Sequence, residues 1–300
     1  MNTSKYNINF VGKFPIAVIA SVLLVGGSLI LFLTKGLNYG VDFRGGAEIQ
    51  VGFGEKVDLA KLRESLSNNG FNSSSVQRIG EDGKNEFLIK VSSSEENLNS
   101  VTDKITAMLM ADFKNINPEI LKTDIVGPKA GEELRISGFQ AMAWALLMIM
   151  IYIALRFDYK YSPGAIVALL HDVIIIIGVF VLMQKEFSLQ IVGALLAVIG
   201  YSVNDTVVVY DRVREHEERD HSKELNTQIN TALNETLSRT LLTSLTTFIV
   251  AGVMFVMGGG IIHDFFFAIC LGVIVGTYSS IFVAAPTIMF FDKFTKKTNA

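Results

Sequence analysis

The sequence predicts an α-helical membrane protein with six transmembrane helices and a ferredoxin-like α+β extracytoplasmic domain between helices 1 and 2. Three observations predict this fold class. Half of the 300 residues are hydrophobic and the mean hydropathy is +0.42, too apolar for an ordinary soluble domain. Six apolar stretches are long enough to cross a bilayer core, which takes about 20 residues. One long polar insertion separates the first stretch from the other five.

The six apolar stretches are the expected membrane helices, one before the insertion and five after it. They are Phe14–Leu33, Gly138–Leu155, Pro163–Met183, Leu189–Tyr210, Thr240–Met257 and Phe265–Phe291. The first is too long for the apolar part of a signal peptide, and no small-residue cleavage site follows it. We therefore expect it to stay in place as an uncleaved helix.

The lysines and arginines of the short loops predict the orientation of the chain, because positive loops stay in the cytoplasm. Arg156 and Lys160 lie between the second and third stretches, and a basic segment separates the fourth from the fifth. The short loops of the opposite side carry only Lys185. Both termini are therefore expected to be cytoplasmic, with residues 35–136 outside.

The polar insertion has the pattern of a small folded domain. Strands are expected at Glu48–Phe53, Ser75–Ile79, Glu86–Val91 and Ile120–Val126, helices at Asp58–Ser67 and Asn97–Phe113, and a turn at Glu81–Gly83. Asp58 is the expected cap of the first helix. The order β-α-β-β-α-β is the split βαβ, ferredoxin-like arrangement.

These predictions divide the chain into three parts. Residues 1–34 form the cytoplasmic N-terminus and first helix, residues 35–130 the outer α+β domain, and residues 131–300 the remaining helices. The last part includes a charged cytoplasmic loop at 211–239, with a helical pattern from Leu225, and a cytoplasmic C-terminus. The segment Ala130–Ile136 is expected to form a short amphipathic helix that leads into the second span.

Composition and motifs exclude several classes of function. The net charge is −3 without a long basic run, so nucleic acid is not an expected partner. Cys270 is the single cysteine, so a disulfide within the chain is impossible. The sequence has no glycine-rich phosphate loop, no zinc-type spacing and no serine-nucleophile elbow. We therefore expect neither an enzyme nor a bound cofactor or metal.

Asp205 is the most informative residue, because it is the only charge in the stretch Leu189–Tyr210. A carboxylate at the centre of a membrane helix costs about 2.5–3.5 kcal/mol, and such residues usually face a bundle interior and serve transport. Arg239 begins the fifth span on the same side of the membrane, so the two charges are expected near one depth. From spacing alone, a proton relay and a static ion pair both remain open.

Hydroxyl and amide groups accompany this acid. Thr243 and Thr247 follow Arg239 on the fifth span, where their hydroxyls are expected to hold water beside Asp205. Asn204 directly precedes Asp205 and continues a row of small residues at helical spacing, Gly193, Ala197 and Gly200. Such a row lets another helix approach closely, so it is first a packing signal.

The third span carries a second polar pair, His171 and Asp172, near the membrane midplane. The pair can be structural, bonded to neighbouring helices, or it can be a relay; the spacing leaves both interpretations open. Intramembrane proteolysis by Asp172 and Asp205 is a further alternative. It is disfavoured, because nothing in the spacing shows that the two acids face each other.

Several motifs in a fixed order resemble the SecF family, the accessory membrane subunit of the bacterial Sec translocase. They include Gly40–Gly46 after the first span, Val126–Pro128 before the second and Ala168–Val173 in the third. The most specific are Gly200–Val208 in the fourth span and Leu237–Thr240 at the start of the fifth.

The resemblance implies a half bundle of the RND transporter type in the bacterial inner membrane, with residues 35–136 periplasmic. The implied partners are SecD as a heteromer, the SecYEG channel, SecA indirectly and the translocating polypeptide. The implied role is to assist export with the proton motive force. In the family, the positions matching Asp205 and Arg239 are tied to proton passage.

Two alternative functions remain open at this stage. The chain can be a non-conducting scaffold or binding subunit of the translocase, in which the polar residues only pack the complex. It can also be one half of an RND-type exporter of small molecules or lipids. The small size of the outer domain disfavours the exporter.

Overall fold

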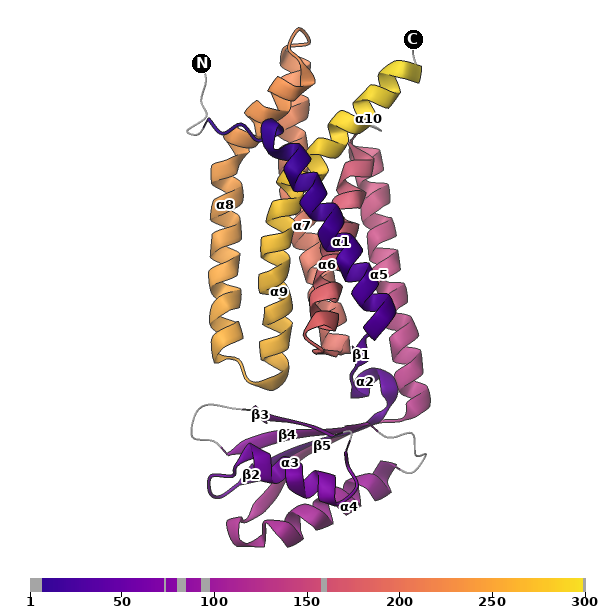
Figure 1. The fold of residues 1–300 in the computed structure, drawn as a ribbon, viewed down its shortest axis with the longest axis vertical. Helices are drawn as coiled ribbons and strands as arrows, with labels where there is room; N and C mark the ends of the chain where they lie inside the picture. The colour runs from indigo at the N-terminus through magenta and orange to yellow at the C-terminus, as the bar shows by residue number, and fades with distance from the viewer. Residues whose placement is uncertain (1–6, 73, 80–84, 93–97, 158–160, 299–300) are drawn as a thin grey trace.

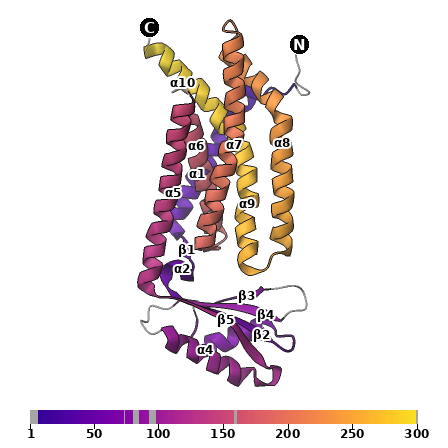
Figure 2. The ribbon, with the colours of Figure 1, turned by 180° about the vertical axis from the view of Figure 1, so that it is seen from behind.

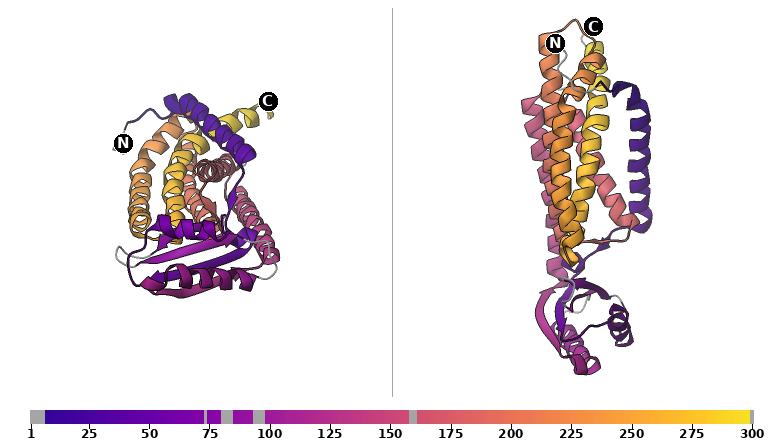
Figure 3. Two further views of the ribbon diagram at one scale, coloured as in Figure 1. Left: turned by 60° about the horizontal axis from the view of Figure 1, so that its bottom comes forward. Right: turned by 90° about the vertical axis from the view of Figure 1, so that its left-hand side faces the viewer.

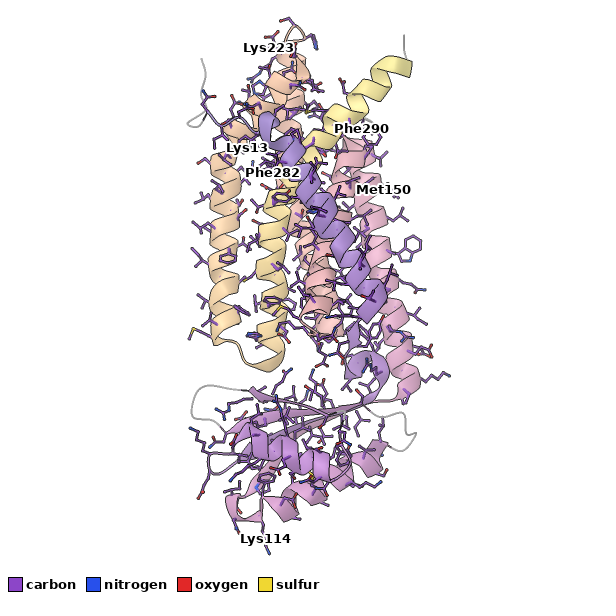
Figure 4. All side chains as sticks on the ribbon, viewed as in Figure 1. Lys13, Lys114, Met150, Lys223, Phe282 and Phe290 are labelled. Atoms are coloured by element: carbon purple, nitrogen blue, oxygen red, sulfur yellow. The ribbon has the colours of Figure 1, made fainter. Side chains whose placement is uncertain are left out.

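The computed structural model describes residues 7–72, 74–79, 85–92, 98–157 and 161–298. It consists of a long helical bundle with a small sheet domain at one end (Figure 1). Both ends of the described chain lie at the other end of the bundle (Figure 1). Lys223, between the fourth and fifth long helices, and Lys114, in the sheet domain, mark the two ends of the molecule (Figure 4).

Within the described part of the chain, six helices are long and apolar enough to cross a membrane. Five of them are α1 (Phe14–Lys35), α5 (Pro128–Arg156), α6 (Ser162–Leu182), α7 (Leu189–Arg219) and α8 (Leu225–Met257). The sixth runs through α9 (Gly260–Ser279), the π-helical segment η3 (Ser280–Ala284) and α10 (Ala285–Thr298). Each overlaps one predicted stretch, which confirms the membrane fold class.

The helices differ from the prediction mainly at their ends. The predicted helix at Ala130–Ile136 is present, but it forms the first turns of α5, which runs from Pro128 to Arg156 without a break. Proline at the start of α5 suits a first helical turn, and no further proline follows within the helix. The charged loop is largely helical, since α7 continues to Arg219 and α8 begins at the predicted Leu225.

Three helices form the centre of the bundle, and α1 lies at its edge. About half or more of the apolar window is buried in α6, α7 and the sixth span, against 17% in α1, α5 and α8. Figure 3 shows α1 standing to one side of the other helices, where it packs on α6. Much of the apolar surface of α1, α5 and α8 therefore faces outward, as in a bundle surrounded by lipid or by a partner.

The sheet domain lies between α1 and α5 in the chain. Its elements are β2 (Gly46–Phe53), α3 (Leu59–Asn68), β3 (Ser74–Ile79), β4 (Glu86–Ser92), α4 (Leu98–Asp112) and β5 (Pro118–Val126). The antiparallel sheet has the order β3-β4-β2-β5, which is the predicted ferredoxin-like arrangement. The predicted turn at 81–83 lies outside the described residues.

The two faces of this sheet have different environments. Alternate side chains of β2 and β4, such as Ile49, Val51 and Ile89, pack against α3 and α4 in a closed apolar core. Asp58 caps α3 by accepting a hydrogen bond from the Ala60 amide, as predicted. The opposite face, which carries Glu48, points toward the bundle (Figure 2).

Three short elements at the junction of the two parts were not predicted. The strand β1 (Asn38–Tyr39) pairs in parallel with β6 (Glu186–Phe187), which connects α6 to α7. The one-turn helix α2 (Val41–Arg44) follows β1 and precedes β2. Elements of two to four residues are too short to show a periodic pattern, so the sequence cannot reveal them.

Candidate functional site

Asp205 lies inside the bundle on α7, with its side chain only 6% exposed. Its two carboxylate oxygens accept hydrogen bonds from different helices. Thr240 of α8 donates to Oδ1 at 2.7 Å, and Ser280 of η3 donates to Oδ2 at 2.9 Å. A buried carboxylate is tolerated only when such donors replace the water that it has lost. The acid is therefore held between α8 and the π-helical segment.

Arg239 does not pair with this acid. Across the described residues, no ion pair joins the Arg239 guanidinium to Asp205, and the Arg239 side chain is exposed. The static ion pair that the spacing left open is therefore not formed between the described side chains. The reason is angular: Arg239 and Thr240 diverge by about 100° on α8, so only Thr240 turns toward Asp205. Arg239 nevertheless lies close enough for its charge to act on the carboxylate.

The other predicted residues lie around the acid without touching it. Asn204 is exposed and lines a groove of about 560 Å³ between α7 and α8, which Arg239 also lines. Thr243 donates to the carbonyl oxygens of Arg239 and Thr240, and Thr247 donates to the Thr243 carbonyl. Both hydroxyls are thus bonded to their own helix.

The far end of the same groove carries a cluster of paired charges. Arg212 donates to Glu235 at 2.5 Å and also to Glu215, and His216 lies 2.8 Å from the same Glu235 carboxylate. These pairs connect the extended ends of α7 and α8 beyond the apolar part of both helices. Two arginines line the groove. Arg212 is paired with Glu215 and Glu235, whereas Arg239 has no ion pair with any residue that the structure describes.

His171 and Asp172 form a second buried polar centre, on α6. Asp172 is 1% exposed, and its Oδ1 lies 3.0 Å from Nδ1 of His171. Its Oδ2 accepts hydrogen bonds from Ser202 of α7 at 2.6 Å and from Ser279 of α9 at 2.9 Å. The structure does not bring Asp172 and Asp205 into contact. Asp172 is bonded to Ser279, and Asp205 is bonded to Ser280.

A third buried charge centre lies at the junction of bundle and sheet domain. Lys90 of β4, 6% exposed, lies 3.0 Å from Glu48 of the neighbouring strand and 3.1 Å from Glu186 of β6. Burial opposes its charge, but the two carboxylates outweigh burial and raise the pKa of Lys90. Burial also raises the pKa of Glu48, against the lowering effect of Lys90. One lysine thus ties the sheet to the loop between α6 and α7.

The glycine motif Gly40–Gly46 forms the connection beside this lysine. Gly45 has φ +83°, and a Cβ there would lie 2.7 Å from the Cα of Pro128, where α5 begins. Gly46 has φ +147°, and its Cβ would lie 2.1 Å from the Val91 carbonyl oxygen. Only glycine fits both positions. Asp42 of α2 accepts a hydrogen bond from the Leu189 amide, so it also caps α7.

Small residues on α7 and α9 have different surroundings. Gly272 of α9 packs so tightly on α7 that a Cβ would lie 2.2 Å from Val198. By contrast, Gly193 and Gly200 of α7 have no described atom within 4 Å of an added Cβ, and Asn204 is exposed. The row on α7 is therefore an open face in this chain, where another helix can approach.

Sequence reasoning missed the hydroxyl donors that hold the two carboxylates. Ser202, Ser279 and Ser280 lie in apolar stretches, and each donates to Asp172 or Asp205. A signal existed, because buried hydroxyls in membrane helices often bond across helices. Within the described residues, no group of three or more His, Cys, Asp or Glu side chains is placed to hold a metal ion.

Two family profiles match the chain. The family described as "Protein export membrane protein SecD/SecF, C-terminal" matches residues 105–293. The "SecD/SecF GG Motif" matches residues 24–57, which include the glycines at the junction.

Curated relatives and solved structures agree with these profiles. "Protein translocase subunit SecF" of Magnetococcus marinus is 43% identical over 95% of this chain and 92% of its own length. The same-named subunit of Calditerrivibrio nitroreducens is 40% identical over 97% and 96%. The crystal structure of SecDF from Thermus thermophilus matches with a TM-score of 0.82 at 33% identity, over 98% of this chain. SecDF in its super-membrane-facing form matches with a TM-score of 0.74. The chain spans 40% of each SecDF chain.

Proposed function

This chain belongs to the SecF family of protein translocase subunits, and from that premise we propose that it assists protein export by using the proton motive force. Protonation and deprotonation of Asp205 change the packing of α7, α8 and η3. The sheet domain, on the periplasmic side of the inner membrane, carries that motion to a translocating polypeptide. The chain acts with SecD as a heteromer, on the SecYEG channel and, through it, with SecA.

One observation carries this proposal: a buried carboxylate whose described hydrogen-bond partners are two hydroxyls, Thr240 and Ser280. A hydroxyl donates to a carboxylate, but it can also turn and accept a hydrogen bond from the carboxylic acid. Both ionisation states of Asp205 therefore keep their hydrogen bonds. A cationic partner would instead favour the ionised state alone.

The open face of α7 and the groove between α7 and α8 support SecD as the partner. Asn204 and Arg239 line that groove, and the small-residue row of α7 continues the same exposed surface. A second six-helix half packed there would enclose Arg239 beside Asp205, in a place where its charge is less screened by solvent. The proton path would then run between the two halves, with Arg239 setting the local potential.

The junction supports a mechanical link to the sheet domain. Lys90 joins the sheet to the α6–α7 loop, and Asp42 of α2 caps the first turn of α7. A shift of α7 therefore moves a segment that is bonded to the domain. Moving one charge through 100 mV is worth about 2.3 kcal/mol, enough to change a two-state equilibrium some fifty-fold.

The substitution Asp205→Asn tests the proposal, with Asp103→Asn on an exposed position of α4 as the matched control. We expect the heteromer with SecD to assemble, and export into inverted membrane vesicles to lose its dependence on the proton motive force. Full dependence in the Asp205→Asn vesicles would overturn the proposal. Loss of copurification with SecD would instead favour the scaffold function, in which these polar groups only pack the complex.

A further inference from the structure

Asp172 and Asp205 are connected through two consecutive residues of the sixth span. Ser279 donates to Asp172, and the next residue, Ser280, donates to Asp205, each at 2.9 Å. On a regular helix, adjacent side chains diverge by about 100°, so one helix can serve two acids on different neighbours. Here Asp172 is on α6 and Asp205 on α7, and the sixth span packs against both helices.

The two serines also share one acceptor. Both hydroxyls lie within hydrogen-bond distance of the Gly276 carbonyl oxygen, Ser279 at 3.1 Å and Ser280 at 2.7 Å. A hydroxyl has a single hydrogen, so each serine donates either to its carboxylate or to this carbonyl. The protonation state of each acid therefore biases the orientation of its serine. The Gly276 carbonyl has two lone pairs and already accepts the Ser280 backbone N–H, so one position remains for the two hydroxyls and their choices are interdependent.

The backbone at this point is not a regular α-helix. The π-helical segment η3 begins at Ser280 and ends at Ala284. Such single-turn π segments interrupt the hydrogen-bond ladder and occur frequently at functional sites. The serine pair thus lies at the point where the sixth span changes from α-helical to π-helical hydrogen bonding.

Asp172 has a second connection, through His171, that leads out of the network. The Nε2 atom of His171 is buried and has no hydrogen-bond partner in the described structure. The imidazole lines a groove between α1, α6 and α10, and its ring stacks on Tyr278 with 5.9 Å between centroids. The titratable side chain in contact with this pair is Tyr278 on α9. The serines connect the pair to Asp205 on α7, and Arg239 of α8 lies beyond Asp205. The residues of α1 and α10 that line the groove are not titratable.

We propose that Asp172 and His171 form a second proton-exchanging centre, coupled to Asp205 through Ser279 and Ser280. The inference rests on the proposed function of Asp205. With Asp172 ionised, Nδ1 of His171 carries the hydrogen and Nε2 offers a lone pair. A proton that binds Nε2 makes the ring cationic; the Nδ1–H bond then breaks and an O–H bond forms on Asp172. The histidine is left neutral with its hydrogen on Nε2.

Protonation of Asp172 on Oδ1 removes the negative charge that Oδ2 shares, which weakens the hydrogen bond from Ser279. Donation from Ser279 to the Gly276 carbonyl then becomes relatively more favourable, and there it competes with Ser280. Ser280 is thereby favoured as a donor to Asp205, so the charge on one acid depends on the proton on the other. Two ionisable groups that interact in this way titrate in two steps that belong to the pair. The bundle then responds to two protons rather than one.

Infrared titration of aspartate carboxyl groups in the intact heteromer tests the proposal. Wild type is compared with Asp172→Asn, Asp205→Asn and the double variant, each with isotope-labelled aspartate. We expect two carboxyl bands that titrate, each removed by one single variant. We also expect each single variant to displace the midpoint of the remaining band by about one pH unit.

Hydroxyl removal tests the route of the coupling. In a background with Ser279→Ala and Ser280→Ala, each aspartate substitution should displace the titration midpoint of the remaining carboxyl band by less than half as much as it does with both serines present. The matched control is Thr246→Ala, because Thr246 is exposed and donates only to its own helix. If Asp172→Asn fails to assemble with SecD, His171→Gln supplies a second test, since it should displace both midpoints while keeping a neutral hydrogen-bonding side chain.

The outcomes separate this inference from the proposed function. A single titrating band that belongs to Asp205 and is unmoved by Asp172→Asn or His171→Gln would overturn the second centre and leave the first intact. Two bands that titrate without displacing each other would overturn the coupling. No titrating carboxyl at either position would overturn both the inference and the proposed function.

Discussion

The junction and the bundle both bury carboxylates, but they stabilise them in different ways. At the junction, Glu48 and Glu186 share the ammonium group of Lys90. In the bundle, the described donors to Asp205 and Asp172 are hydroxyls and one imidazole. A fixed cation favours one ionisation state, whereas hydroxyls serve both. The comparison indicates a static tie at the junction and an adjustable centre in the membrane.

Removing the cation should break the junction, and this is the largest effect that we expect. In Lys90→Met, two mostly buried carboxylates lose their partner, which typically costs about 3 kcal/mol. Amide hydrogen exchange of β2 and β4 in the heteromer should rise by about two orders of magnitude. Lys122→Met is the control, because its ion pair with Asp124 is exposed and should contribute almost nothing. Equal exchange in Lys90→Met and wild type would show that the junction does not depend on this charge.

Removing one hydroxyl donor should have an intermediate effect in the bundle. Thr240→Val preserves the shape of the side chain but removes a hydrogen bond to a buried carboxylate, at a cost of about 1.5 kcal/mol. Thermal unfolding of the heteromer measures that loss. The pH profile of export should also change, because one of the two hydroxyls that follow the proton is gone. An unaltered profile would assign Thr240 a packing role only.

Replacing the acid itself should cost the least stability of these three substitutions. Asn in place of Asp205 can still accept from Thr240, and the Ser280 hydroxyl can turn to accept from its amide. We expect a change of less than about 1 kcal/mol in thermal unfolding, although coupling to the proton motive force is lost. A large destabilisation would mean that the bundle, like the junction, needs the charge for its structure.

The pH dependence of the sheet domain gives the smallest expected effect. The pKa of Glu48 is raised by burial, so the folded domain holds this proton more tightly than the unfolded chain does. The contribution of Glu48 to stability is therefore fully present below its ordinary pKa of 4.5 and is lost as pH rises through the folded value. A second loss follows above pH 10.5, through the raised pKa of Lys90. Urea unfolding against pH should show both steps. Glu48→Gln should remove the first and reduce the second, because Glu48 is one of the two carboxylates that raise the pKa of Lys90.

The fold was largely predictable because hydropathy and periodicity act locally. The strand β2 and the capped helix α3 follow from alternation and from Asp58, and the membrane helices follow from apolar length. Elements of two to four residues, such as α2, are too short to show a hydrophobic periodicity. The π-helical turn at Ser280 has no local signal either, since it depends on how the sixth span packs.

The site was only partly predictable, because the position of a residue along a membrane helix does not determine the direction in which its side chain points. Asp205 was identified as a single charge in an apolar stretch, and Arg239 directly precedes the threonine that bonds this acid. Whether Arg239 or Thr240 turns toward the acid depends on helix rotation, which the sequence does not specify. Partners on other helices, such as Ser280, become visible only when the bundle is assembled.

The most direct test is an isotope-edited infrared titration that observes the Asp205 carboxyl alone, in the heteromer with SecD. Asp205→Asn identifies its band, and the measurement is repeated with and without a proton gradient across sealed vesicles. We predict that the carboxyl gains and loses a proton within the pH range in which the complex stays folded, and that the gradient changes its occupancy. A carboxyl that remains in one ionisation state under all of these conditions would contradict proton coupling at Asp205.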